Sequence, residues 1–226
     1  MQTMATTDKT TIYTKMAEVP MIPVFYHGDY EIAYNVLKAC YVGGVRVFEF
    51  TNRGEKALEV YQRLCAIVRN EVPDLCLGVG SIVYALDADA FIKAGADFIV
   101  GPCYSEEVWR WCSFCDIPYI PGCGTVTEIF NAMQKGCRVT KLFPGDVYGP
   151  NMVKDILGPM PWSKIMVTGG VSPDRENLSA WFNAGVFSVG MGSKLFPNEI
   201  IKNKDWQYIT NKCQEILSII KELKVK

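Results

Sequence analysis

One pattern recurs along the chain of 226 residues and limits what it can fold into. In each copy, an amphipathic segment ends at glycine, and a short apolar run follows before a turn. Four clear copies are YVGGVRVFEF, IKAGADFIVGP, MQKGCRVTKLFPG and FNAGVFSVGMG. Glycine after an amphipathic segment is typical of a helix C-terminus, so each copy predicts a helix followed by a strand.

Eight apolar runs of this kind can be counted, and helical patterns separate them. The runs are residues 21–26, 45–50, 75–81, 97–102, 117–122, 138–143, 164–170 and 187–192. The clearest helical patterns are residues 30–41, 55–70 and 127–135. Strands that alternate with helices favour an α/β fold, and eight of them predict a (β/α)8 TIM-type barrel formed by residues 1–226 as a single domain.

A doubly wound open sheet is the alternative fold for the same alternation of strands and helices. Such a sheet usually carries a Gly-x-Gly-x-x-Gly fingerprint after its first strand, where this chain has YHGDYE. We therefore prefer the barrel. The segment before residue 21 is expected to add an N-terminal helix that covers the barrel bottom, and residues 198–226 to form one long amphipathic helical stretch.

The composition excludes several classes of partner. The formal net charge is −1, which does not favour nucleic acid or an anionic membrane. No apolar run reaches the roughly 18 residues of a membrane span, and the first fifteen residues lack the apolar core of a signal peptide. The nine scattered cysteines indicate reduced thiols, so we expect a cytoplasmic protein.

Neither a metal nor a cofactor is expected. His27 is the only histidine, so a histidine-based triad or a multi-histidine metal site is excluded, and a hydrogen-bonded loop imidazole is the default interpretation. Cys112 and Cys115 form a lone CxxC pair. A redox or zinc role stays open for this pair, but thiols near a helix end are favoured because no second pair and no nearby histidine complete a site.

Two charged residues interrupt apolar strands. In the run VRVFEFTNR, the alternation that places Phe48 and Phe50 against the helices turns Glu49 into the barrel, and Lys141 has the same inward parity in RVTKLF. Burial disfavours an ammonium, which then loses its proton and becomes a nucleophile. A structural ion pair is the alternative, although such pairs often add little net stability.

The ends of three strands carry groups that suit anions. Arg53 follows the second strand, at the end where barrels bind substrate, and its guanidinium can grip a carboxylate or phosphate with two hydrogen bonds. Thr168, Gly169 and Gly170 follow the seventh strand, and Gly192 and Ser193 follow the eighth. Backbone N–H groups there, near a short helix N-terminus, favour a phosphate site, although glycines also serve as plain turns.

These pieces together resemble a known family. The segments GGVRVFEFTNR, GVGSI, AGADFIVGP, IPYIPGCGTVTE, TKLFPGD, MVTGGVSPDREN and GMGSKLF occur in the order and spacing of the 2-keto-3-deoxy-6-phosphogluconate (KDPG) and 4-hydroxy-2-oxoglutarate (KHG) aldolases. The resemblance runs from about residue 20 to about residue 197. The family consists of class I, Schiff-base aldolases on a β/α barrel, which need no cofactor and form trimers.

The resemblance implies a role for each matching residue. Lys141 would form the Schiff base and Glu49 would act as acid and base, while Arg53 and Ser81 would bind the substrate carboxylate. Phosphate would be bound by Thr168, Gly169, Gly170, Gly192 and Ser193. The pocket wall would be Thr51, Pro102 and Phe143. Three departures from the family pattern, Asn52, Gly145 and Lys194, leave this apparatus intact but make the distal end of the substrate uncertain.

The expected activity is cleavage of KDPG, and possibly KHG, to pyruvate and an aldehyde, either glyceraldehyde 3-phosphate or glyoxylate. The expected partner is thus a small 2-keto acid. Two alternatives stay open: a sugar-phosphate isomerase or epimerase on the same barrel, and a non-catalytic protein that binds phosphorylated sugars.

Overall fold

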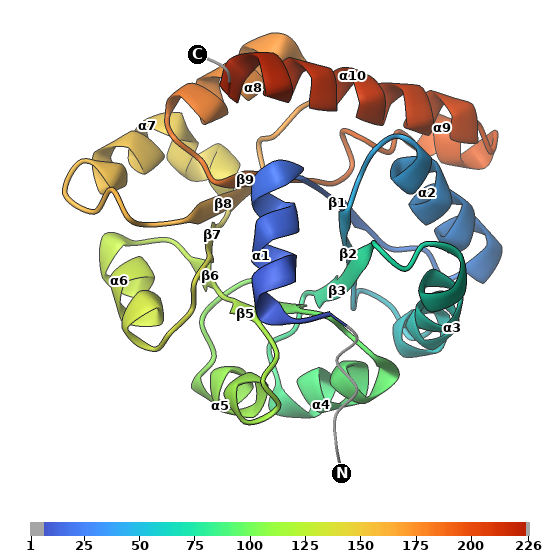
Figure 1. Ribbon diagram of the computed structural model, residues 1–226, viewed down its shortest axis with the longest axis horizontal. Coiled ribbons are helices and arrows are strands. Elements are labelled where there is room, and N and C mark those ends of the chain that lie inside the picture. The colour runs from blue at the N-terminus through green and yellow to red at the C-terminus, as the bar shows by residue number, and fades with distance from the viewer. Residues whose placement is uncertain (1–6, 225–226) are drawn as a thin grey trace.

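The computed structural model describes residues 7–224, in which strands and helices alternate around a central barrel (Figure 1). The strands are β1 (Met21–Phe25), β2 (Val47–Thr51), β3 (Cys76–Gly80), β4 (Ile99–Val100), β5 (Tyr119–Ile120), β6 (Gly122–Cys123), β7 (Thr140–Leu142), β8 (Ile165–Thr168) and β9 (Ser188–Met191). The helices are α1 (Lys9–Glu18), α2 (Tyr30–Val42), α3 (Ala57–Glu71), α4 (Ala85–Ala94), α5 (Glu106–Phe114), α6 (Val126–Gln134), α7 (Gly145–Leu157), α8 (Arg175–Asn183), α9 (Asn198–Lys202) and α10 (Trp206–Lys224).

The strands of residues 7–224 form one parallel sheet in the order β5-β4-β3-β2-β1-β9-β8-β7-β6. Its two ends, β5 and β6, are separated only by Pro121, which has no N–H for the ladder. Residues 119–123 therefore act as one strand, and the sheet closes on itself. The predicted TIM-type barrel is confirmed, and each of the eight apolar runs overlaps a strand.

Local sequence signals set where the helices begin. The Asp29 carboxylate accepts hydrogen bonds from the backbone N–H groups of Glu31 and Ile32 at the start of α2. A capping box formed by Thr125 and Glu128 starts α6. Such caps satisfy backbone donors that the first helical turn leaves free, so these two helices start within a few residues of the strands that precede them.

The amino end of the barrel is closed by α1, which lies across it in Figure 1. Ile12, Tyr13 and Met16 of this helix are buried in one apolar cluster with inward side chains from around the barrel. Those side chains are Ile22, Val47, Cys76, Phe98, Val100, Ile120, Val139 and Met166. The expected extra helix at the barrel bottom is confirmed, and it makes this end a dry floor.

The expectation of one continuous helical stretch at the C-terminus is wrong. The described part contains two helices, α9 and α10, separated at residues 203–205, and residues 225–226 lie outside it. Lys204 has φ +55°, a left-handed conformation that a helix interior does not tolerate, and the Asp205 carboxylate accepts a hydrogen bond from Tyr208 N to start α10. Within residues 7–224, no helix is both long and apolar enough to cross a membrane.

The floor yields a stability prediction. Changing Ile12 to Ala should lower the free energy of unfolding by about 2–5 kcal/mol, because it leaves a cavity in a fully buried cluster. Thr14→Ala, on the exposed face of the same helix, should stay within about 0.5 kcal/mol of the wild type. Urea unfolding followed by circular dichroism measures both. Equal effects of the two substitutions would mean that α1 does not seal the barrel.

Candidate active site

Lys141 and Glu49 face each other inside the barrel. Lys141 is on β7 and Glu49 on β2, and the Lys141 Nζ lies 4.0 Å from the Glu49 Oε1. The residues are only 3% and 1% exposed, respectively. Both side chains therefore point inward, as the parity of their strands predicted. The pair lies above the α1 floor, since Val47 and Val139 precede it by two positions on the same strands and belong to the floor cluster.

Glycines on neighbouring strands give these side chains their space. A Cβ atom on Gly80 would lie 1.8 Å from the Glu49 Oε1, so any other residue would displace the carboxylate. Gly122 is in register with Lys141, and a Cβ atom there would lie 2.1 Å from the Pro102 carbonyl oxygen. Sequence reasoning missed this role. The sequence feature that could have shown it is the pair Gly78 and Gly80. Both occupy inward-facing positions of β3, so these two positions place no side chain inside the barrel.

Burial moves the pKa values of the two groups toward each other. It lowers the pKa of Lys141 below 10.5, and the nearby Arg53 charge adds to this, while Glu49 opposes it. Burial also raises the pKa of Glu49 above 4.5, against the opposing charges of Lys141 and Arg53. Desolvation is the largest cause in both cases, so the site favours an uncharged amine beside a carboxyl group that readily holds a proton.

Several buried polar atoms of the site lack a partner. Both carboxylate oxygens of Glu49 lack a hydrogen-bond partner among the described residues. The same is true of the hydroxyl oxygens of Thr51 and Thr168. Buried polar atoms are normally satisfied, and leaving one unpaired costs about 1–3 kcal/mol. These atoms share the inward parity of their strands with Glu49 and Lys141. The barrel interior therefore offers hydrogen-bonding groups to a polar molecule that enters it.

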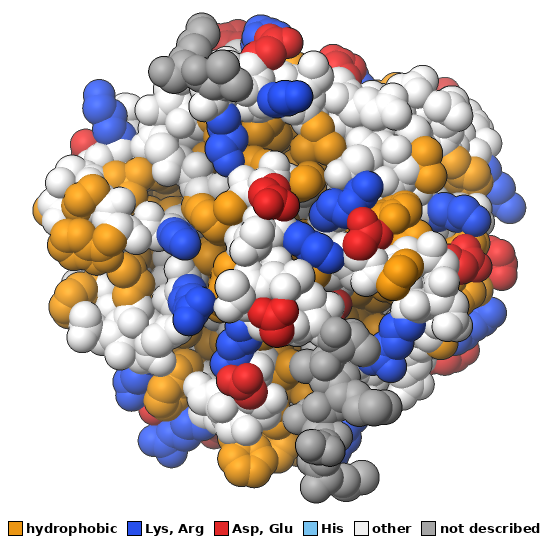
Figure 2. Space-filling model, viewed as in Figure 1, with side chains coloured by type: hydrophobic (Ala, Val, Ile, Leu, Met, Phe, Trp, Pro, Cys, Tyr) orange, Lys and Arg blue, Asp and Glu red, His pale blue; other side chains and the backbone are white. Residues whose placement is uncertain are grey.

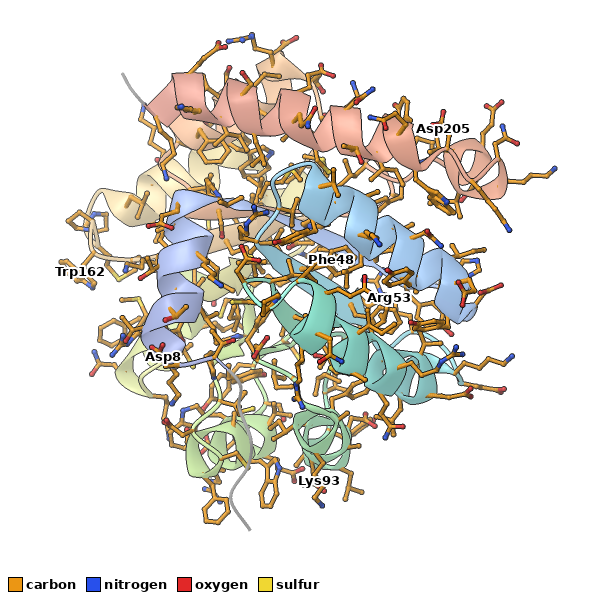
Figure 3. All side chains as sticks on the ribbon, turned by 45° about the vertical axis from the view of Figure 1, so that its right-hand side comes forward. Asp8, Phe48, Arg53, Lys93, Trp162 and Asp205 are labelled. Carbon is orange, nitrogen blue, oxygen red and sulfur yellow. The ribbon has the colours of Figure 1, made fainter. Side chains whose placement is uncertain are left out.

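Arg53 and Ser81 meet at the open end of the barrel. The Arg53 Nε donates a hydrogen bond of 3.1 Å to the Ser81 Oγ, and Ser81 has φ +64°. In Figure 3, Arg53 lies well apart from Asp8, which caps the start of α1. An exposed guanidinium at the carboxyl end of β2 can bind an anion in front of Lys141. Phe143 lies nearby, with its ring centroid 5.0 Å from the Lys141 Nζ.

The glycine-rich turns follow β8 and β9. Gly169 and Gly170 have φ +92° and +68°, so this turn needs glycine, and it packs against Asp146 of α7. Gly192 and Ser193 lie at the start of a turn after β9. The short helix that follows, α9, begins at Asn198, five residues after Ser193. Any anion here would bind to turn N–H groups and hydroxyls.

The remaining candidates have ordinary surroundings. The His27 Nδ1 accepts a hydrogen bond of 3.0 Å from Asp29 N, which confirms a hydrogen-bonded loop imidazole. Cys112 and Cys115 are free, and burial raises the pKa of both thiols. Within the described chain, no group of three or more His, Cys, Asp or Glu residues could hold a metal ion.

Comparison with known proteins agrees with this arrangement. The family model described as "KDPG and KHG aldolase" matches residues 12–212. A 2-dehydro-3-deoxy-phosphogluconate aldolase of Dickeya dadantii is 32% identical over 202 residues, covering 88% of this chain and 91% of the relative. A KHG/KDPG aldolase of Escherichia coli is 30% identical over 210 residues, covering 92% and 95%.

A solved structure extends the similarity to the fold. The KDPG aldolase of Legionella pneumophila, which holds pyruvate as a covalent carbinolamine intermediate captured at low pH, superposes with a TM-score of 0.82. It is 30% identical in sequence, and the match covers 90% of this chain and 97% of that one. The matched region takes in both inward charges and the turns at the barrel mouth. The chain belongs to the KDPG and KHG aldolase family.

Proposed function

We propose that this protein is a class I aldolase that cleaves a 2-keto-3-deoxy acid through a Schiff base on Lys141. The observation that carries the proposal is the isolated pair of Lys141 and Glu49, buried 4.0 Å apart in the barrel. Burial lowers the pKa of the Lys141 amine, which raises the fraction of the amine that is neutral and nucleophilic at a given pH. A carboxyl group beside it, with a raised pKa, can both give and take a proton.

The first half of the reaction builds the Schiff base. The neutral Lys141 amine attacks the ketone carbon of the substrate and forms a carbinolamine, and the amine proton passes to the former ketone oxygen. Glu49 then donates its proton to this hydroxyl, which leaves as water, and the C–N bond becomes an iminium. The capture of pyruvate as a carbinolamine by the Legionella pneumophila relative supports this step.

The second half breaks the carbon–carbon bond. The Glu49 carboxylate takes the proton of the C4 hydroxyl, the C3–C4 bond breaks, and its electron pair moves to the iminium as an enamine. The aldehyde leaves. Glu49 returns the proton to C3, and water hydrolyses the iminium to release pyruvate and restore the amine. The iminium nitrogen accepts the electron pair when the C3–C4 bond breaks, and the same pair then forms the C3–H bond. The proton released on hydrolysis returns to the Glu49 carboxylate, so these steps use only groups of the chain, the substrate and water.

Arg53 and Ser81 would bind the substrate carboxylate. Their mutual hydrogen bond orients the guanidinium at the barrel mouth, and a planar fork suits the two oxygens of a carboxylate. With the carboxylate there, the adjacent ketone points down toward Lys141. Thr51, Pro102 and Phe143 would form the walls of this pocket.

We further propose that the phosphorylated acid, KDPG, is preferred over KHG. The Gly169–Gly170 turn and the Gly192–Ser193 turn end adjacent strands, and the buried Thr168 hydroxyl lies between them, facing Gly190. A phosphate at the far end of a six-carbon acid could reach these groups, whereas the shorter KHG would leave them to water. The exposed Lys194 could add a cation to the same turn.

The two alternatives explain less. An isomerase or epimerase would use Lys141 as a fixed positive charge, yet burial disfavours the charged form. A binding protein without turnover has no need for a buried amine beside a carboxyl group that lacks hydrogen-bond partners, which costs stability. Both alternatives predict no covalent adduct with pyruvate, so trapping separates them from the aldolase.

Assembly and compartment complete the proposal. We infer a homotrimer in the cytoplasm. Large apolar side chains stay exposed on the α6 and α7 side, among them Phe130, Val147 and Trp162, at 44%, 72% and 63%. Such side chains suit a subunit interface. Sedimentation equilibrium measures the mass of the assembly.

All nine cysteines are free, which suits a reducing compartment.

Lys141 should be the lysine that reacts with pyruvate. Incubation with pyruvate and borohydride should add one pyruvate-derived mass, mapped by peptide sequencing to Lys141, because among the lysines of residues 7–224 it is the one buried beside a carboxyl group. Lys141→Met should abolish the adduct. Lys164→Met serves as the matched control, since Lys164 lies exposed at the amino end of β8 and should leave trapping unchanged. An adduct on Lys164 or Lys194 would contradict the assignment.

Replacing Glu49 by Gln should reduce kcat by about 10²–10⁴, the usual contribution of general acid–base catalysis. The pH dependence of trapping should change as well. Trapping in the wild type should rise through a midpoint below 10.5, because the reacting amine must be neutral and its pKa is lowered. Since the Glu49 charge holds that pKa up, its removal should shift the midpoint to lower pH. Near-normal turnover in Glu49→Gln would leave Glu49 a structural partner only.

The phosphate preference is tested by kcat/KM for KDPG and KHG on one preparation. Two charged hydrogen bonds gained in the transition state, each of about 1.5–3 kcal/mol, would favour KDPG by about 10²–10⁴. Ser193→Ala and Lys194→Ala should each reduce the ratio, whereas Lys154→Ala on α7 should not. If kcat/KM is the same for KHG and KDPG, and neither mutation changes their ratio, the phosphate site is contradicted and these glycines serve only as turns.

A further inference from the structure

A second pocket lies at the amino end of the barrel, on the opposite side from Lys141 and Glu49. It has a volume of about 210 Å³. Its walls come from α1, α5, the residues that lead into β5, and the turn between α6 and β7. In Figure 1, this is the region between α1 and the α5 and α6 helices. The aldolase reaction proposed above makes no use of it.

Three cationic side chains line this pocket: Lys9, Lys135 and Arg138. Lys9 pairs with Asp116, and Lys135 lies 3.3 Å from a carboxylate oxygen of Glu106. Within the part of the chain that the structure describes, no carboxylate forms an ion pair with Arg138. Three positive and two negative charges leave one positive charge uncompensated. Figure 2 shows lysine and arginine side chains on both sides of α1 on this face.

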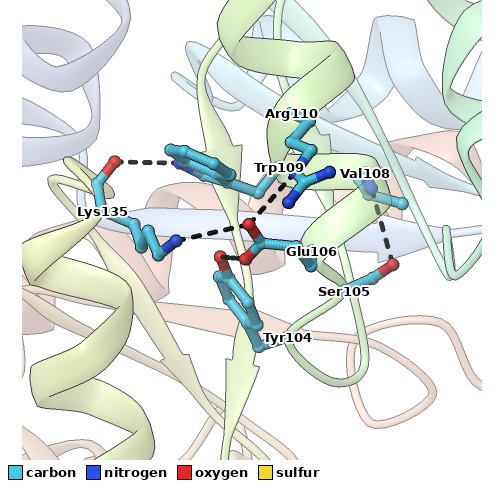
Figure 4. Close-up of polar contacts among 7 residues, drawn as sticks. All are labelled: Tyr104, Ser105, Glu106, Val108, Trp109, Arg110 and Lys135. Atoms are coloured by element: carbon cyan, nitrogen blue, oxygen red, sulfur yellow. Dashed lines mark hydrogen bonds and ion pairs between the residues drawn. The ribbon is translucent and has the colours of Figure 1, made fainter.

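Aromatic rings hold two of these cations in place. The Arg138 guanidinium carbon lies 5.6 Å from the centroid of the Tyr13 ring, and the Lys135 Nζ lies 4.6 Å from that of Trp109. The Trp109 indole N–H also donates a hydrogen bond of 2.9 Å to the Lys135 carbonyl (Figure 4). Cations fixed before a ligand arrives lose less side-chain entropy on binding, so this pocket is preorganised for an anion.

We propose that this pocket binds a small molecule that carries a phosphate group. Arginine and lysine are the side chains that bind phosphate oxygens, and the rings of Tyr13 and Trp109 offer apolar surface to a short carbon chain. The volume of about 210 Å³ is enough for several waters, so a phosphate with a few carbons fits. The ligand would contact α1, α5 and the turn before β7 together.

The test uses inorganic phosphate as the probe, titrated at constant ionic strength into the full-length protein. Tryptophan fluorescence should change saturably, and Trp109→Phe should lose that change, because Trp109 lines the pocket. The midpoint of thermal unfolding should also rise with phosphate, since a ligand that binds only the folded state stabilises it. Arg138→Gln should weaken binding at least about tenfold, which corresponds to about 1.4 kcal/mol.

Arg63→Gln is the matched control. Arg63 also lies over a tyrosine ring, that of Tyr30 at 3.7 Å, but on α3 and outside the pocket, so its loss should leave phosphate binding unchanged. Pyruvate trapping by each variant confirms an intact fold, and Lys135→Gln replaces Arg138→Gln if the latter does not fold. Phosphate binding at the catalytic mouth would survive in Arg138→Gln, so the two sites are distinguished.

Two results would overturn the proposal. One is an equal dissociation constant for phosphate in the wild type and in Arg138→Gln. The other is the absence of a phosphate effect on both fluorescence and the unfolding midpoint. Failure of the aldolase proposal would appear elsewhere, as the absence of a pyruvate adduct on Lys141.

Discussion

The desolvation of Lys141 is the constraint on which the rest of this structure depends. An ammonium with almost no exposed surface in an apolar barrel is costly, and a single carboxylate at 4.0 Å does not replace the water it has lost. The protein tolerates this because the neutral amine carries no such penalty. In the proposed reaction, the stability that the chain gives up at this position would be the same free energy that makes the amine reactive.

The parts of the barrel around Lys141 and Glu49 limit how much water can reach the two side chains. Below the pair, α1 and the ring of inward apolar side chains keep out water from the amino end. Beside it, Gly80 and Gly122 remove side chains where the carboxylate and the Pro102 backbone must fit. Above it, Arg53 leaves the mouth polar and open. Since α1 seals the amino end, a substrate would enter from the carboxyl end, and in the proposed reaction its carboxylate would meet Arg53 before its ketone meets Lys141.

Much of this was readable in the sequence, since the signals are local. The period of two along β2 placed Glu49 inside the barrel, and glycine after each amphipathic segment gave the alternation of helix and strand. What could not be read there depended on single backbone conformations. A left-handed Lys204 divides the C-terminal stretch, and a turn separates Ser193 from the short helix α9. Neither leaves a mark in hydrophobic periodicity, because lysine and serine are common in helices and turns alike.

The opposing effects within the buried pair also give the proposed reaction its order. Before the substrate binds, burial favours a neutral amine and a protonated carboxyl group. The iminium that then forms is a protonated Schiff base, and its positive charge a few ångströms away would lower the pKa of Glu49. Glu49 thus gives up its proton at the step that expels water. It is a carboxylate, able to accept a proton, when the carbon–carbon bond must break. A single electrostatic contact, with no group moving into place, would therefore set which residue holds the proton at each stage.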